Sequence, residues 1–226
     1  SEDIVEKIKS SLKKRSTGVP SRFLYDLNMP KELLLFLKRV FFLQKEDLVP
    51  GGKYHNFSDF FAFPCPDNRK FFFDEFLELP HKKYQKYKSV FKGIAESDFI
   101  FHFPYQSYDN AIRFIEEASN DRKVKSIKIT LYRVADTSRI NKALINASVR
   151  GIHVTAFDEV QARFDEESNI YWGDELSKAG VNVIYSYDEL KVHAKVCLVE
   201  REENGKDVRY AFLSSGNFNE KTAKIY

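Results

Sequence analysis

The sequence predicts an α/β protein: a layered domain with a mixed, largely parallel sheet flanked by helices, preceded by a smaller α+β segment. Three observations carry this prediction. From residue 98 onward, short apolar runs typical of strands alternate with segments of helical periodicity. Gly151 and Gly180 each follow a helical segment at the position where glycine favours termination. The sequence EENG at 202–205 separates two strand-like runs and predicts a hairpin turn.

The N-terminal part is expected to hold fewer regular elements. A short helix is predicted over 2–14 and an extended segment over 21–30. Pro30 suits the first turn of a helix that runs over 31–43. A Pro-Gly-Gly turn follows, and then an aromatic-rich stretch at 54–73, which we expect to form core and interface.

The C-terminal part is predicted in more detail. We expect strands at 98–105, 124–134, 152–160, 181–186, 193–200 and 208–215, and helices at 107–119, 139–151 and 165–180, with Ser107 as N-cap of the first helix. The basic, irregular segment before this region predicts a boundary between two domains. We place the first domain at residues 1–90 and the second at residues 91–226.

Composition limits the classes of protein that the sequence can describe. Hydrophobic residues make up 43% and charged residues 31%, as in an ordinary globular protein, and the net charge of +3 does not by itself call for nucleic acid. No apolar run is long enough to span a membrane, and no signal peptide is visible. Cys197 lies in a predicted core strand, so we expect a buried free thiol and a cytoplasmic setting. Both ends of the sequence look abrupt, which suggests a fragment of a longer protein.

Polar residues that could carry chemistry follow the predicted strands. In open α/β sheets, sites gather at strand ends. His193 and Lys195 lie two positions apart in a predicted strand and should share one face. A metal site needs further ligands, which are missing nearby, and the lysine would repel a cation. The pair instead suits an anion: the histidine as nucleophile toward phosphorus, with the lysine neutralising phosphate charge.

Less specific interpretations stay open for the same residues. An isolated H-x-K is more often a half-buried histidine beside a strand-edge lysine. Arginines such as Arg133 and Arg163 most often form surface ion pairs, and Arg163 has acidic neighbours. Tyr226 could simply be frayed.

The wider context carries a resemblance to a known superfamily. H-x-K followed at this distance by "SSGNFN" resembles the phospholipase D superfamily, in which histidine attacks phosphorus. Glu200 stands where that superfamily usually has aspartate, and Ser214 where it has glycine, which argues against a plain phosphodiesterase. The stretches "IKITLYRVADTSRI", "VQARFDEESNIYW", "LKVHAKVCLVE" and "GNFNEKTAKIY" resemble class-1 polyphosphate kinase, densely over residues 96–226. "LNMPKELLLFL" and "LVPGGKYHNFSDFFAFP" resemble the end of that family's head domain.

The resemblance implies a role for individual residues. His193 matches the autophosphorylated histidine, and Arg133 and Arg163 match arginines around the Mg-phosphate group, which they would contact through phosphate because a cation does not coordinate Mg²⁺. Tyr226 matches a nucleotide-contacting tyrosine. Lys195 and Asn217 should line the same pocket.

The resemblance also implies an activity. It is the reversible transfer of the terminal phosphate of ATP to polyphosphate, so ATP, ADP and polyphosphate are the expected partners. Mg²⁺ would accompany the nucleotide. The full-length enzyme is expected to be a homo-oligomer. It allows association with the inner face of the membrane. Sites of this superfamily need two H-x-K halves that face each other, and we assign one such half here, at "HAK", so we expect the fragment alone to be inactive. Two alternatives remain: a phospholipase D-like phosphodiesterase, and a non-catalytic polyanion-binding domain.

Overall fold

The computed structural model describes residues 2–18, 20–64, 69–74, 76–135, 137–160, 162, 166–187 and 191–224. The chain divides into two compact units, one formed by Ser1–Lys9 with Leu77–Tyr226 and the other by Ser10–Phe76. Helix α1 (Glu2–Thr17) runs from the first unit into the second. Within the described residues, no helix combines the length and the apolar character that a membrane span requires. The boundary predicted between residues 90 and 91 stays a prediction.

The smaller unit is built around a two-stranded parallel sheet. Strands β1 (Phe23–Asp26) and β2 (Leu48–Gly51) pair in parallel, and helix α2 (Lys31–Val40) connects them. Pro30 occupies the N-cap of α2, one position before the first turn in which it was predicted. Three short 3₁₀ helices complete the unit: η1 (Lys45–Asp47), η2 (Phe57–Ala62) and η3 (Arg69–Phe71).

The aromatic stretch at 54–73 does not form a core. Its described rings are exposed: Tyr54, Phe57, Phe60, Phe63, Phe71, Phe72 and Phe73. The ring of Phe57 stacks on that of Phe60, with centroids 6.1 Å apart, so these side chains pack mainly along the chain. The expectation of a core here is therefore wrong, because the prolines and short 3₁₀ turns leave the rings no sheet or helix face to pack against.

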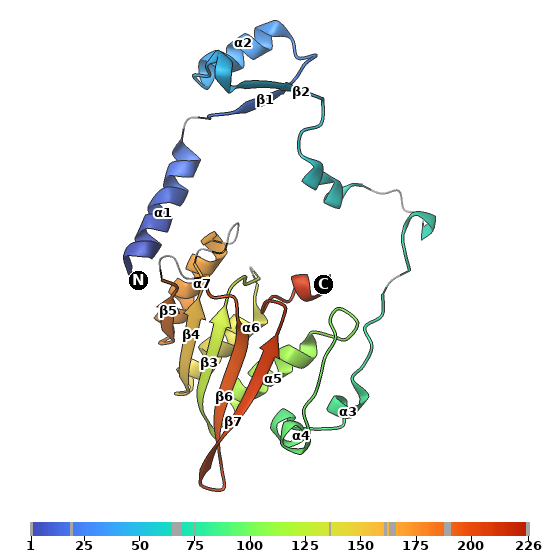
Figure 1. Cartoon of the computed structure of the whole chain (residues 1–226), viewed down its shortest axis with the longest axis vertical. Coiled ribbons are helices and arrows are strands. Elements are labelled where there is room, and N and C mark those ends of the chain that lie inside the picture. Colours follow the sequence, from blue (N-terminus) through green and yellow to red (C-terminus); the bar gives the residue numbers. More distant parts are fainter. Residues whose placement is uncertain are drawn as a thin grey trace. The chain divides into compact units, whose positions relative to one another are not determined.

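The larger unit contains the mixed sheet that the sequence predicts (Figure 1). Five strands form it in the order β5-β4-β3-β6-β7. Their bounds are β3 Val124–Leu131, β4 His153–Asp158, β5 Asn182–Tyr185, β6 Lys195–Glu203 and β7 Lys206–Ser214. Strands β3, β4 and β5 run parallel, whereas β6 runs antiparallel to both β3 and β7. The predicted fold class is confirmed.

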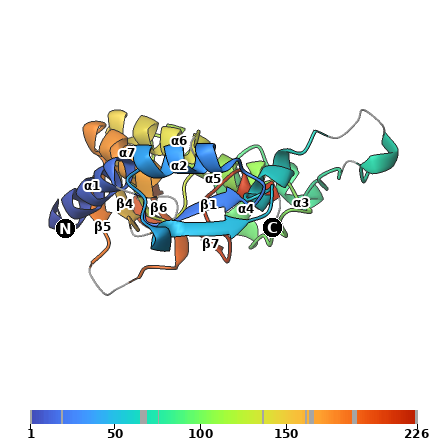
Figure 2. The same cartoon turned by 90° about the horizontal axis from the view of Figure 1, so that it is seen from above.

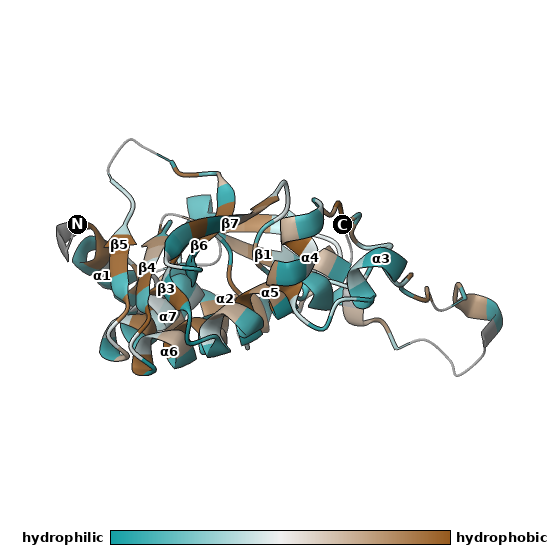
Figure 3. Cartoon of the chain, turned by 90° about the horizontal axis from the view of Figure 1, so that it is seen from below, coloured by the Kyte–Doolittle hydropathy of each residue, from teal (hydrophilic) through white to brown (hydrophobic). Residues whose placement is uncertain are grey.

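Three helices lie on one face of this sheet (Figures 1 and 2): α5 Asp109–Asn120, α6 Arg139–Val149 and α7 Glu166–Lys178. Apolar and polar residues both occur along the strands (Figure 3), and burial alternates along β3 and β4. In β3, Ile127, Ile129 and Leu131 are buried while Lys128 is exposed. Burial of such aliphatic side chains contributes roughly 1.5–3 kcal/mol each. The core of this unit therefore lies between the sheet and the three helices.

Local signals explain where the helices and the hairpin end. The Ser138 hydroxyl accepts a hydrogen bond from the Asn141 N–H (3.1 Å) and caps α6. Gly151 (φ 88°) and Gly180 (φ 86°) follow α6 and α7 in the left-handed conformation that glycine adopts most easily. The β6–β7 hairpin turns at residues 204 and 205, both with positive φ, as the Asn-Gly pair predicts.

The strand predicted at 98–105 is absent, although residues 98–105 are all described. Phe99, Phe101 and Phe103 are partly buried and alternate with exposed neighbours, which gave the strand-like pattern. Their rings pack on one another and on Tyr84, with centroids of Phe99 and Phe101 at 5.1 and 5.0 Å from that of Tyr84. The alternation thus comes from ring packing and not from a hydrogen-bonded ladder. Ser107 is likewise not the N-cap of α5: Tyr108 holds that position, and the Ser107 hydroxyl accepts from the Asp109 N–H.

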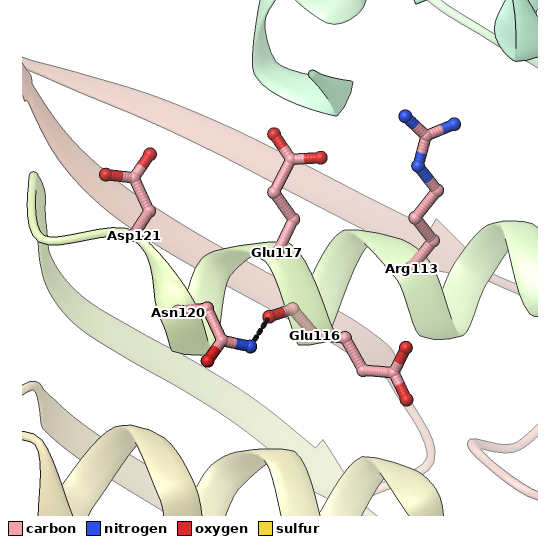
Figure 4. A pocket seen from close by; sticks show the side chains of 5 residues that line it. All are labelled: Arg113, Glu116, Glu117, Asn120 and Asp121. Carbon is pink, nitrogen blue, oxygen red and sulfur yellow. Dashed lines mark hydrogen bonds between the residues drawn. The ribbon is translucent and has the colours of Figure 1, made fainter. Parts of the chain in front are cut away.

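Two short helices precede this aromatic segment, α3 (Lys82–Gln85) and α4 (Val90–Glu96). The Glu117 carboxylate of α5 caps α4 from outside: it accepts hydrogen bonds from the Ser89 hydroxyl (2.6 Å) and the Val90 N–H (2.8 Å). Arg113 lies on the same side of α5 as Glu117 (Figure 4) and donates to the Tyr87 carbonyl at 2.6 Å. These contacts attach α4 to α5.

Removal of the Glu117 carboxylate is therefore expected to lower stability. Because Glu117→Ala leaves the first N–H of α4 without its acceptor, we expect the free energy of unfolding to fall by about 1–3 kcal/mol. Ser89→Ala removes only one of the two donors and should cost less. Urea unfolding of both single variants and the double variant measures the coupling between them. Strict additivity of the two changes would contradict the capping role.

Candidate functional site

The site lies at one edge of the five-stranded sheet. Parallel strands β3, β4 and β5 all end there, at Leu131, Asp158 and Tyr185. Antiparallel β6 begins at the same edge with Lys195, which pairs with Ser214 at the end of β7. The polar residues that follow or precede these strand ends are therefore brought together by the topology.

His193 lies two residues before β6 and is exposed. Its ring meets the Tyr132 ring edge to face, with centroids 5.1 Å apart and an interplanar angle of 81°. The prediction that His193 and Lys195 share a strand face is wrong, because the strand begins only at Lys195. The imidazole is nevertheless presented at the sheet edge and not turned into the core.

Lys195 is buried, with 5% of its surface exposed, on the same side of β6 as Cys197 and Val199. Its ammonium donates a hydrogen bond to the His193 carbonyl at 2.7 Å. Burial, and secondly the nearby Arg133 guanidinium, lower the pKa of Lys195. The less specific interpretation, in which Lys195 is an ordinary lysine at a strand edge, does not hold because the side chain is buried.

Tyr132 organises the cations around the histidine, and sequence reasoning missed it. Lys195 Nζ lies 5.3 Å from the centre of the Tyr132 ring, Lys191 Nζ 5.4 Å and Arg133 Cζ 5.8 Å. Each of these cation–π contacts contributes roughly 0.5–2 kcal/mol, and together they offset part of the repulsion between the three cations. The available signal was its position: Tyr132 lies near the end of the strand predicted at 124–134, next to Arg133, which was already selected.

Arg133 and Asn217 line one cavity of about 940 Å³ together with residues 214–216. The Asn217 Oδ1 atom is buried, and the part of the chain that the structure describes offers it no hydrogen-bond partner. Tyr108 donates from its hydroxyl to the Asn217 carbonyl (3.4 Å), which fixes the backbone there. The amide thus belongs to the wall of a cavity that Arg133 also lines.

The residues after Asn217 have structural roles. Asn219 Oδ1 accepts from the N–H groups of Lys221 (3.0 Å) and Thr222 (3.1 Å) and so caps the 3₁₀ helix η4 (Thr222–Lys224). Glu220 Oε1 accepts from the Arg139 N–H at 2.7 Å, at the start of α6. These contacts attach the loop to the helical layer and hold Asn217 in place.

Two further residues fix the backbone around His193. Thr130 on β3 donates from its hydroxyl to the Ala194 carbonyl (2.7 Å) and accepts from the Val196 N–H (3.0 Å). Glu159, directly after β4, accepts from the Val192 N–H at 2.9 Å. Sequence reasoning missed both, because these contacts join segments far apart along the chain.

Comparison with known families identifies this arrangement. The family model described as "Polyphosphate kinase C-terminal domain 1" matches residues 89–226, which contain the whole site, and that described as "Polyphosphate kinase middle domain" matches residues 1–63. The chain belongs to the polyphosphate kinase family. The predicted resemblance is confirmed.

Members of the polyphosphate kinase family resemble this chain over nearly its full length. The polyphosphate kinase of Escherichia coli K12 is 43% identical over 226 residues, covering 99% of this chain and 33% of its own length. That of Yersinia pestis is 42% identical over 224 residues. The crystal structure of polyphosphate kinase from Porphyromonas gingivalis aligns with 92% of this chain and 32% of its own, with 34% identity and a TM-score of 0.72. The chain spans about a third of the length of these relatives.

Two candidate residues, Arg163 and Tyr226, lie outside the described residues. Their roles stay predictions from the polyphosphate kinase resemblance. Among the residues that the structure does describe, no group of three or more histidine, cysteine, aspartate or glutamate side chains could hold a metal ion. The ring that contacts His193 is that of Tyr132, and the cationic side chains of Lys191, Lys195 and Arg133 lie around this ring.

Asp158, at the end of β4, is 1% exposed, and its Oδ1 has no hydrogen-bond partner within the described residues. Burial, and secondly the Glu159 carboxylate, raise the pKa of Asp158 to about 8. In the folded state Asp158 therefore stays protonated up to a higher pH than in the unfolded chain, where its pKa is the ordinary 3.8.

Stability is consequently expected to fall as the pH rises from about 4 to 8, by up to about 1.4 kcal/mol per pH unit from this group. Asp158→Asn should remove that dependence, so that its free energy of unfolding exceeds that of the wild type increasingly toward pH 8. Urea unfolding at several pH values measures the difference, with Asp74→Asn at an exposed carboxyl as control. A constant difference across this range would contradict the prediction.

Proposed function

We propose that the protein is an ATP:polyphosphate phosphotransferase that works through a phosphohistidine on His193. The observation that carries the proposal is the exposed imidazole at the sheet edge with three cations, Lys191, Lys195 and Arg133, gathered on the neighbouring Tyr132 ring. Membership of the polyphosphate kinase family supports it.

The proposed reaction has two half-reactions. A lone pair of the neutral His193 imidazole attacks the terminal phosphorus of ATP. The bond from that phosphorus to the bridging oxygen breaks, and ADP leaves with the electron pair. A terminal oxygen of polyphosphate then attacks the same phosphorus, the P–N bond breaks, and the imidazole is restored. Division into two transfers lowers each barrier.

The chain's own side chains would lower the repulsion between polyanions. Arg133 suits bidentate contact with phosphate oxygens, and Lys195 acts as a compact buried charge. Asn217 can donate from its amide to a phosphate oxygen in the shared cavity. Mg²⁺ would arrive with the nucleotide and neutralise its phosphates. We propose that Arg163 and Tyr226 contribute to phosphate and nucleotide binding, as the family resemblance implies.

One experiment separates this proposal from its competitors. Full-length protein is incubated with γ-labelled ATP and then exposed to acid or alkali. A phosphohistidine is labile in acid and stable in alkali, so this pattern supports the proposal. Hydrolysis of phosphodiesters without nucleotide would instead support a phospholipase D-like activity, and salt-sensitive polyanion binding without any labelling would support a binding domain.

The proposal extends to the wider setting of the protein. A second H-x-K half is needed. Besides "HAK", this tripeptide occurs in the sequence as "HKK" at residues 81–83, where the His81 side chain caps the short helix α3. We propose that these 226 residues alone do not turn over. Turnover by the isolated chain at the rate of the full-length enzyme would refute this. We also propose a cytoplasmic location, supported by the buried free thiol of Cys197 and to be tested by cell fractionation. The family resemblance leads us to propose a homo-oligomer of the full-length protein, to be tested by light scattering.

A further inference from the structure

Glu159 is a fully buried acid at the sheet edge, with 0% of its surface exposed. Both of its carboxylate oxygens accept hydrogen bonds from the segment that leads to His193. Oε1 accepts from the Ser186 hydroxyl at 2.8 Å, and Oε2 accepts from the Val192 N–H at 2.9 Å. Burial of a carboxylate costs several kcal/mol unless its oxygens are satisfied, so this double contact is needed to hold the group there.

The backbone of Glu159 is also hydrogen-bonded to residues next to the site. Its N–H donates to the Leu131 carbonyl at 3.0 Å, at the end of β3. The buried Asn169 side chain of α7 donates to the carbonyls of both Glu159 (3.0 Å) and Tyr132 (2.8 Å). The carboxylate is therefore held at a defined place relative to Tyr132, the residue whose ring contacts the His193 ring.

The peptide around His193 is fixed by side chains, since His193 precedes the strand. Glu159 binds the N–H of Val192, one residue before the histidine. Lys195 binds the carbonyl of His193 itself, and Thr130 binds the carbonyl of Ala194. Among these contacts, Glu159 holds the segment on the N-terminal side of the histidine.

We propose that Glu159 is a positioning residue for the phosphorylated histidine: its carboxylate joins Ser186 to Val192 and thereby sets the place of the His193 ring. This inference rests on the proposed function. The carboxylate does not need to touch substrate. Displacement of a reacting group by about 1 Å can reduce a rate about 100-fold, so loss of one backbone contact next to the nucleophile has a large effect.

The test is single-turnover formation of the phosphoenzyme by full-length protein with γ-labelled ATP. Glu159→Gln is not suitable, because its oxygen can accept from the Val192 N–H while its NH₂ group donates to the Ser186 hydroxyl. Glu159→Met nearly keeps the length of the side chain but removes both hydrogen-bond acceptors. We expect the rate constant to fall about 100-fold. The ATP concentration for half-maximal rate should stay within about twofold, because Arg133 and Lys195 are unaltered. Ser186→Ala, which leaves the Val192 contact, should reduce the rate constant far less.

The control is Glu202→Gln, at an exposed carboxyl at the hairpin end of β6, and it should match the wild type. A purely structural role of Glu159 would lower the labelled fraction and leave the rate constant of that fraction unchanged, which would overturn the inference. So would a Glu159→Met rate constant within about twofold of the wild type. If the wild type forms no phosphohistidine, the proposed function fails, and this inference fails with it.

Discussion

His193→Ala is expected to abolish the acid-labile phosphoenzyme. Without the imidazole the proposed nucleophile is lost, so transfer from ATP to polyphosphate should fall by about 10⁴-fold or more. The fold should survive the substitution, because His193 is exposed and its described ring contact is the edge-to-face contact with Tyr132. Such a contact contributes about 0.5–1.5 kcal/mol.

The measurement combines labelling with a stability control. His153→Ala removes another exposed histidine, at the start of β4 and thus at the opposite end of that strand from the site. It should label like the wild type. Undiminished labelling of His193→Ala, with urea unfolding that shows the variant folded, would place the phosphate on another residue and remove the proposed mechanism.

Lys195→Met is expected to separate activity from stability. Methionine nearly matches the length of the lysine stem but removes the charge that would neutralise phosphate. Loss of such an electrostatic group reduces kcat by about 10²–10³-fold. Stability should not fall, since the substitution removes a buried cation whose charged form is disfavoured by burial and by Arg133.

Initial rates of polyphosphate synthesis and urea unfolding test both parts of this prediction. Lys128→Met removes an exposed lysine from neighbouring strand β3 and should leave the rate unchanged. If Lys195→Met were strongly destabilised, the ammonium would be chiefly a structural donor to the His193 carbonyl. If it kept full activity, Lys195 would not belong to the phosphate site.

The elements of the larger unit follow closely from local sequence signals. The alternation in β3 and the glycines Gly151 and Gly180 act over a few residues, and the structure has each where it was predicted. The N-cap Ser138 of α6 was not predicted from the sequence. The failure at 98–105 has a physical cause: ring packing against Tyr84 produces the same alternation as a strand. Periodicity reports burial and cannot by itself report hydrogen bonding between strands.

The candidate site was predicted less completely. His193, Lys195 and Arg133 were selected by residue type and by their place at strand ends, and the structure places Lys195 and Arg133 on the same Tyr132 ring that the histidine contacts. Tyr132 itself was missed because a tyrosine at a strand end has no distinctive spacing. Glu159 was missed because its contact with Val192 joins residues 33 positions apart.

The sequence by itself determined the types of most elements of the larger unit, the H-x-K pair and the likeness to one kinase family. These depend on free energies set within a few neighbouring residues, or on motifs that can be read along the chain. The tertiary structure decided that β6 lies antiparallel beside β3, so that the segment before β6 meets the ends of β3 and β4. That arrangement depends on the packing of the whole sheet against its helices, and it alone brings Tyr132 and Glu159 to the histidine.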